Sequence, residues 1–101
     1  MSSNITSKQR AALRGIANSY DTIFQIGKSS EISENLVKQV NDALAARELI
    51  KLRVLNNSEY SAKDAAVELS EKTNSEIVQV IGTRFVLFKQ NPDPDKRKIS
   101  I

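Results

Sequence analysis

Residues 49–55 read LIKLRVL, and this stretch decides the fold. Side chains along a β-strand alternate between its two faces, so every second residue shares a face. The even-numbered positions here are all apolar, and we expect that face of the strand to point into the core. The opposite face carries Lys51 and Arg53, which we expect to point toward solvent or a ligand. A carboxylate on a neighbouring strand is an equally good partner for these two cations.

Two further elements precede this strand. Thr22–Ile26 is rich in β-branched and aromatic residues and ends at Gly27, a pattern typical of a short strand. A helix is predicted from Ser33, its N-cap, to about Arg47. A helix between two strands is typical of a β-α-β crossover, so we expect the two strands to be parallel neighbours with a right-handed connection.

The second half of the chain predicts a helix and a hairpin. Ser61–Thr73 has apolar positions at helical spacing and begins with a capping residue. Two strands, Glu76–Ile81 and Arg84–Phe88, flank the dipeptide Gly82-Thr83. Glycine at the first position of a two-residue turn favours type II′, which predicts an antiparallel hairpin.

A first helix over Thr6–Ser19, with Thr6 as its N-cap, completes the element order α-β-α-β-α-β-β. We therefore expect an α/β single-domain sandwich, in which helices cover a four-stranded mixed sheet. This domain spans residues 1–90. Residues 91–101 form a basic C-terminal tail, which we expect to be extended and partly mobile.

The chain contains neither Cys nor His, which excludes thiol nucleophiles, thiolate zinc sites and histidine-based catalysis. We therefore expect no enzyme activity, no cofactor, no metal site and no small-molecule substrate. No apolar run approaches 18 residues, and the first ten residues lack the apolar region of a signal peptide. We expect a soluble monomer with no membrane contact, cytoplasmic in a bacterium, whereas in a eukaryote an organelle is also possible.

Charge is unevenly distributed along the sequence. Residues 56–76 hold two cations and five acids, whereas the rest of the chain holds thirteen cations and seven acids. The third predicted helix is therefore an acidic segment on a basic protein. Such polarity can orient a protein on a phosphate backbone, because the acidic side is repelled. A charged helix face that is simply solvated is the alternative.

Stretches spread over most of the chain resemble one known family. They are TSKQR (residues 6–10) with Leu13 and Arg14, IFQIGK (23–28), ENLVKQV (34–40), ALAARELIK (43–51), VQVIG (78–82), VLF (86–88) and RKIS (97–100). They are similar to the CRM domain (chloroplast RNA splicing and ribosome maturation) in its stand-alone bacterial YhbY-like form. The resemblance implies an RNA-binding domain with the element order given above. It also implies a role in assembly of the large ribosomal subunit, because bacterial members associate with its precursors.

The RNA-binding element of the family is a GxxG loop between the first strand and the second helix. The resemblance places it at Gly27, Lys28, Ser29 and Ser30, with Ser30 where the family has its second glycine. Glycines let the loop backbone approach a phosphate closely. If the fourth position needs a positive φ, serine strains the loop. If it needs only close approach, the serine hydroxyl can donate to the phosphate.

Other cations are candidates for RNA contact. The resemblance places Lys8, Arg10 and Arg14 on the first helix beside the loop. Lys51, Arg53 and Arg84, on the predicted strands, are further candidates. As isolated helix cations, Arg10 and Arg14 are more often simply solvated, and Arg84 can be exposed without a function. Phe85 and Phe88 point to opposite faces of their strand, so that one belongs to the core and the other is a candidate for base stacking.

The resemblance therefore implies an RNA-binding protein that acts in assembly of the large ribosomal subunit, and we expect it to contact the phosphate backbone of rRNA. The alternative is a protein-interaction adaptor that uses the acidic third helix or an exposed sheet edge.

Overall fold

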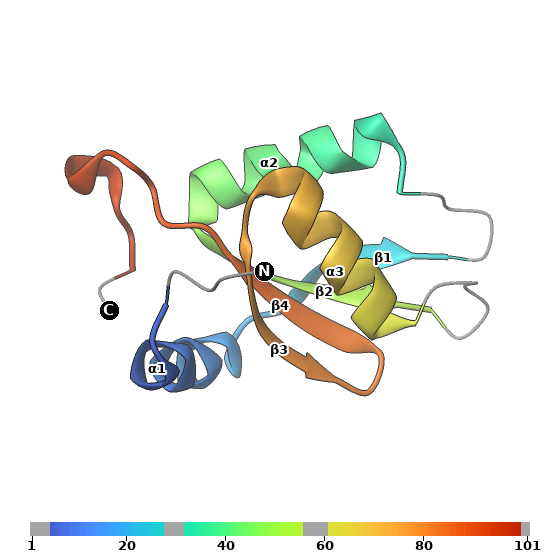
Figure 1. The fold of residues 1–101 in the computed structure, drawn as a ribbon, viewed down its shortest axis with the longest axis horizontal. Helices are drawn as coiled ribbons and strands as arrows, with labels where there is room; N and C mark the ends of the chain where they lie inside the picture. Colours follow the sequence, from blue (N-terminus) through green and yellow to red (C-terminus); the bar gives the residue numbers. More distant parts are fainter. Residues whose placement is uncertain (1–4, 28–31, 56–60, 100–101) are drawn as a thin grey trace.

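The computed structural model describes residues 5–27, 32–55 and 61–99, and Figure 1 shows their fold. The elements in chain order are α1 (Ser7–Ala17), β1 (Thr22–Ile26), α2 (Glu34–Arg47), β2 (Leu49–Val54), α3 (Ala62–Thr73), β3 (Glu76–Ile81), β4 (Arg84–Phe88) and the 3-10 turn η1 (Pro94–Lys96). The predicted order of helices and strands is confirmed, and so is the α/β fold class.

The strands form one mixed sheet in the order β1-β2-β4-β3. β1 and β2 are parallel, as predicted, whereas β4 is antiparallel to both β2 and β3. The hairpin therefore joins the sheet through β4, which becomes a central strand. Its sequence RFVLF is buried from Phe85 to Phe88, as expected of a strand that is covered on both faces.

Local sequence signals explain where the elements begin and turn. The hydroxyl oxygen of Thr6 accepts the N–H of Gln9 at 3.1 Å, and the Gln9 side chain accepts the N–H of Thr6 in return. Ser33 and Ser61 cap α2 and α3 in the predicted way. Gly82 has a φ of +57°, and Thr83 is not among the residues with positive φ, which confirms the type II′ turn.

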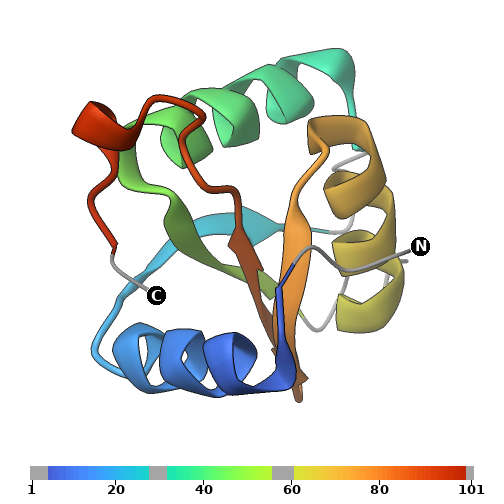
Figure 2. The same ribbon diagram turned by 60° about the vertical axis from the view of Figure 1, so that its left-hand side comes forward.

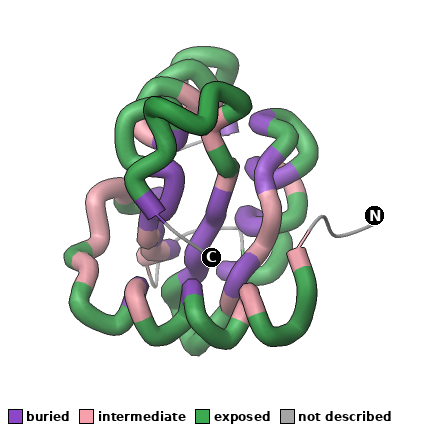
Figure 3. Tube along the Cα trace, turned by 90° about the vertical axis from the view of Figure 1, so that its left-hand side faces the viewer, coloured by how far each residue is buried: buried purple, intermediate pink, exposed green. Residues whose placement is uncertain are grey.

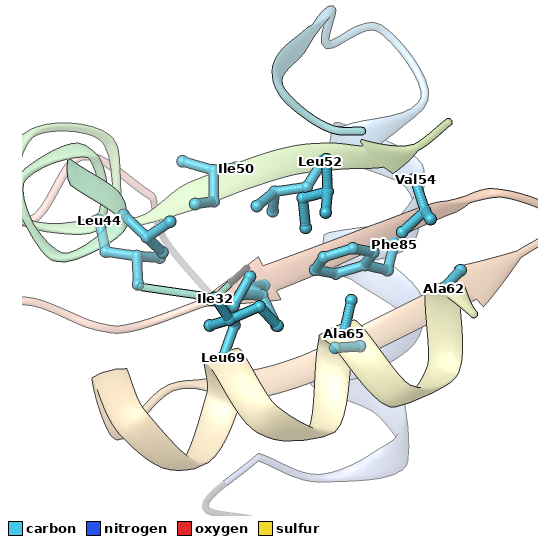
Figure 4. Close-up of a cluster of buried hydrophobic side chains, with 13 residues drawn as sticks. Ile32, Leu44, Ile50, Leu52, Val54, Ala62, Ala65, Leu69 and Phe85 are labelled. Carbon is cyan, nitrogen blue, oxygen red and sulfur yellow. The ribbon is translucent and has the colours of Figure 1, made fainter. Parts of the chain in front are cut away.

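Helices cover both faces of the sheet, with α1 on one face and α2 and α3 on the other (Figure 2). The larger core, here the α2/α3 cluster, includes the predicted even-numbered positions of β2 (Figure 4). Its buried members are Ile26, Ile32, Val40, Leu44, Ile50, Leu52, Val54, Ala62, Ala65, Ala66, Leu69, Phe85 and Leu87. The smaller core, here the α1 cluster, consists of Leu13, Ala17, Leu49, Val78, Val86, Phe88 and Ile99.

One prediction about the aromatic residues is wrong. Phe85 is buried in the α2/α3 cluster and Phe88 in the α1 cluster, so neither ring is available for base stacking. The reason is that α1 packs on the second face of the sheet and buries that face too. Figure 3 shows the buried positions gathered along the strands between the helices.

The C-terminal segment is folded onto the domain rather than extended, so the prediction of an extended tail is wrong. Ile99 is buried in the α1 cluster, and η1 interrupts the segment before it. The anchor is Glu48, a fully buried residue with a φ of +64° at the end of α2. Its carboxylate accepts the backbone N–H groups of Asn91, Lys98 and Ile99. The domain boundary at residue 90 stays a prediction.

Candidate nucleic-acid interface

The predicted RNA-binding loop follows β1 and precedes α2. Gly27 is half-buried directly after the strand. Lys28, Ser29 and Ser30 lie outside the described residues, so their predicted contact with RNA stays a prediction. The surroundings of the loop, however, are described on both sides.

Two features of α2 weaken the attraction between its N-terminal end and a phosphate group. The Ser33 hydroxyl oxygen accepts the N–H of Leu36 at 3.2 Å, so this donor is already satisfied. Glu34 is exposed in the first turn, where its negative charge lies at the positive end of the helix dipole. Cations from other elements therefore strengthen the attraction of a phosphate to this end of the sheet.

Three segments meet at the end of the sheet beside Gly27. The N–H of Leu55 donates to the carbonyl of Ile26 at 2.9 Å, which joins the ends of β1 and β2. The N–H of Val54 donates to the carbonyl of Thr83 at 2.7 Å, which adds the hairpin turn. The last residues of β2 and the first residues of β4 therefore lie close to the start of the loop.

Helix α1 carries three of the predicted cations. Lys8 and Arg14 are exposed, whereas Arg10 is half-buried. Arg10, Arg14 and Asn18 follow one another at intervals of four residues, so they form one stripe along the helix. Lys8 lies in the first turn, at the opposite end of α1 from Asn18.

Lys51, Arg53 and Arg84 occupy the same face of the sheet as α1. Lys51 and Arg53 are half-buried and Arg84 is exposed. The neighbours of Arg53 in register are Arg84 on β4 and Gln25 on β1. Those of Lys51 are Thr22 and Val86. The alternative that a carboxylate on a neighbouring strand pairs with these cations is therefore wrong.

A shallow hollow of about 170 Å³ lies between two of the strand cations and Asn18, the C-cap of α1. Lys51 and Arg84 line it together with the amide side chains of Asn18 and Gln79. The remaining lining residues are Ile81, Phe85 and Val86. Among these described lining residues there is no acid, so the hollow presents positive charge and amide groups to solvent.

The acidic helix lies on the other face of the sheet. Asp64 and Glu71 are exposed on α3, and Glu68 forms an ion pair with Lys72 at 3.1 Å. Figure 2 shows α1 and α3 on opposite sides of the strands. We call the cations of the α1 side the basic face, and they are Lys8, Arg10, Arg14, Lys51, Arg53 and Arg84.

Comparison with known proteins fits this geometry. The family described as the CRS1 / YhbY (CRM) domain has a sequence model that matches residues 5–89. The chain belongs to this family. The CRM domain thus accounts for α1 through β4, including every residue of the basic face.

Relatives of this CRM domain span bacteria and archaea. The probable RNA-binding protein YqeI of Bacillus subtilis is 42% identical over 89 residues, covering 88% of this chain and 92% of the relative. The probable RNA-binding protein MJ0652 of Methanocaldococcus jannaschii is 31% identical over 84% of this chain and 63% of the relative. The solution structure of hypothetical protein SAV1595 from Staphylococcus aureus matches with a TM-score of 0.74 and 44% identity, over 95% of this chain and 99% of that one.

Sequence reasoning missed two polar residues of this CRM domain. Asn18 and Gln79 carry no charge and lie far apart in the chain, yet both line the hollow beside Lys51 and Arg84. For Asn18 the available signal is its four-residue spacing from Arg14. Gln79 reaches the hollow through the pairing of β3 with β4, which places it opposite Val86.

The described residues offer neither a metal site nor a membrane-spanning helix. Within residues 5–27, 32–55 and 61–99, no three acidic residues cluster in a way that could hold a metal ion. In the same ranges, no helix is both long enough and apolar enough to cross a membrane.

Proposed function

We propose that this protein binds RNA through the phosphate backbone and acts in the cytoplasm as an assembly factor for the large ribosomal subunit. The observation that carries RNA binding is the separation of charge across the sheet. The basic face lies on the α1 side, and the acidic helix α3 lies on the other. A polyanion is attracted to the first side and repelled by the second. The names of YqeI and MJ0652, both probable RNA-binding proteins, support the same ligand.

The chemistry of the basic face favours structured RNA bound without base stacking. Phe85 and Phe88 are buried, and Tyr20 and Phe24 are half-buried, so the described residues offer no aromatic platform. Sequence-specific binding of single-stranded RNA relies on such platforms. Cations that contact phosphates instead fix the position of the protein on a folded RNA.

The loop Gly27 to Ser30 supplies close backbone contact in this proposal. Lys8, Arg10 and Arg14 lie on α1, which packs toward the Leu49 and Phe88 end of the sheet, and they neutralise other phosphates of the same RNA. The ribosomal role is supported by the resemblance to stand-alone YhbY-like proteins, whose bacterial members associate with precursors of the large subunit. The RNA partner is therefore rRNA in such a precursor.

Sedimentation of a cell lysate through a density gradient tests the ribosomal role. We expect the protein in fractions that contain precursors of the large subunit, and we expect ribonuclease treatment to release it. A protein that stays at the top of the gradient during active ribosome synthesis would contradict the role.

A protein-interaction adaptor remains the second candidate, because the edge strand β3 exposes apolar side chains. Ile81 is 61% exposed and Val80 is 38% exposed. Sheet edges with exposed apolar residues can accept a strand from another protein. Retention of the protein in large complexes after complete ribonuclease digestion would favour this function over RNA binding.

A further inference from the structure

Two arginines face each other directly across β2 and β4. Arg53 and Arg84 are partners in the antiparallel register. Side chains at directly opposed positions have Cβ atoms only about 4.5–5.5 Å apart, and like charges placed there repel each other. In the part of the chain that the structure describes, neither arginine forms an ion pair with a carboxylate. The repulsion within the pair is therefore not compensated by an acid of the described chain.

Arg53 has a second unmet requirement. Its Nε atom is shielded from solvent and has no hydrogen-bond partner among the described residues. A buried donor without an acceptor is destabilising, so a ligand that supplies an acceptor is favoured at this place. Among the described residues, Arg53 thus has no carboxylate partner, and its Nε has no acceptor.

The surroundings of the pair suit an anion. Lys51 lies two positions before Arg53 on the same face of β2, and it shares the hollow with Arg84. The amide groups of Asn18 and Gln79 add neutral donors at the same place. An anion in this hollow would meet cations and amides, with no acid among the described lining residues.

The position of the pair connects it to the predicted loop. Arg53 lies opposite Gln25 of β1, and Gln25 is two residues before Gly27. Arg84 directly follows Thr83, whose carbonyl accepts the N–H of Val54. An RNA strand that reaches the loop therefore passes close to both guanidinium groups.

We propose that Arg53 and Arg84 form a clamp that holds one phosphate group of the RNA backbone between two guanidinium groups, with Lys51 beside it. This arginine clamp rests on the proposed function and adds to it a defined phosphate site. A guanidinium presents Nε and Nη donors in one plane, and in the clamp the Arg53 side chain turns so that its Nε faces a phosphate oxygen. The bound phosphate supplies the missing acceptor and the missing negative charge at once.

Opposite effects on stability and binding distinguish such a clamp from two solvated cations. Replacing Arg84 with Gln removes the repulsion, so the free protein should melt at the same temperature as wild type or higher at low salt. The same variant should bind a short RNA hairpin roughly 10- to 100-fold more weakly, the range for loss of a charge-assisted hydrogen bond. Lys38→Gln, an equal charge change on α2, serves as the matched control and should change affinity less than about twofold.

A double-variant cycle tests whether the two arginines hold the same phosphate. Once Arg84→Gln has removed the clamp, adding Arg53→Gln should weaken binding much less than it does alone. Arg84→Lys should keep the salt dependence of binding but lose affinity several-fold, because lysine lacks the planar pair of donors. If the losses of RNA affinity in the two arginine variants are additive, the clamp is wrong. The clamp is also wrong if the wild type binds RNA but each arginine variant loses no more affinity than Lys38→Gln. Neither result contradicts the proposed function.

Thermal melting with inorganic phosphate supplies a readout that needs no RNA. Phosphate should raise the melting temperature of the wild type more than sodium chloride of equal ionic strength, and this excess should vanish in Arg84→Gln. If the wild type binds no RNA but phosphate still raises its melting temperature more than sodium chloride does, the anion site is supported and the proposed RNA binding is wrong. If the excess is missing from the wild type, the clamp is wrong.

Discussion

The carboxylate of Glu48 accepts the backbone N–H of Ile99 at 3.0 Å, across 51 positions of the sequence. The same carboxylate accepts the N–H of Asn91 at 2.6 Å and that of Lys98. One buried acid therefore satisfies three donors of a segment that has no strand or α-helix of its own. Ile99, held in this way, completes the α1 cluster against the sheet.

Replacement of Glu48 by Gln is expected to destabilise the protein. Glutamine has an NH₂ group in place of one oxygen, so at least one backbone N–H of the C-terminal segment loses its acceptor. We expect a loss of about 1–3 kcal/mol in the free energy of unfolding, measured by urea denaturation. Glu71→Gln, on the exposed side of α3, is the control and should change stability by less than about 0.5 kcal/mol. Equal denaturation midpoints for the two variants would show that Glu48 does not anchor the segment.

The titration of Glu48 makes stability depend on pH. Burial raises the pKa of its carboxyl, but hydrogen bonds from Asn91, Lys98 and Ile99 and the charge of Arg97 outweigh burial, so the pKa lies below its ordinary value of 4.5. A carboxyl with a lowered pKa in the folded state stabilises the protein above its unfolded-state pKa. That stabilisation is lost as the pH falls through the folded-state pKa. Thermal melts from neutral pH to below pH 4.5 should show a smaller decline for Glu48→Gln than for wild type. Parallel declines would contradict this role.

Val54→Asp should prevent folding. Val54 is 3% exposed in the α2/α3 cluster, and an unpaired charge there is destabilising by about 4 kcal/mol or more. Circular dichroism should show loss of the cooperative thermal transition. Gln25→Asp introduces the same side chain at an exposed position of the neighbouring strand and should leave the transition in place. A normal melting curve for Val54→Asp would mean that the strand faces the other way.

Salt dependence of RNA affinity tests the cations assigned to phosphate contact. Replacing Lys28 or Arg14 with Ala should each flatten the slope of log affinity against log salt. The expected change is about 0.7 for single-stranded and 0.9 for duplex RNA. The loss should be similar for different RNA sequences, because phosphate contacts carry no base identity. Unchanged slopes in titrations at several salt concentrations would remove these residues from the interface.

Charge reversal on α3 separates RNA binding from the adaptor function. The double variant Glu68→Lys with Glu71→Lys should keep RNA affinity or raise it, because α3 lies across the sheet from the basic face. Stability should change little, since the Glu68–Lys72 pair is a partly exposed contact at the helix surface. A loss of RNA affinity greater than tenfold, with the fold intact, would place the RNA-binding surface on this helix.

The sequence predicts the parts of this fold that depend on neighbours along the chain. Serine caps, the glycine turn and the alternation of residues 49–55 each act over a few residues, and all are confirmed. The opposition of Arg53 and Arg84 depends on the pairing of β2 with β4, and periodicity does not specify which hairpin strand becomes central. The anchoring of Ile99 by Glu48 is also non-local, because neither residue stands in a motif that identifies the other. Both features come from tertiary packing.

The central position of β4 has a consequence for synthesis of the protein on the ribosome. β2 emerges early, but its antiparallel partner is β4, whose residues 84–88 are translated more than thirty positions later. Until then one edge of β2 has no partner strand, α2 and α3 cover its apolar face without Phe85 and Leu87 of β4, and Glu48 has none of the three backbone donors that it accepts in the finished fold. Contacts between residues far apart in sequence form slowly and leave apolar surface exposed in the meantime. The nascent chain therefore depends on late translation to close its core, and a pause before residue 84 would prolong its exposure to aggregation.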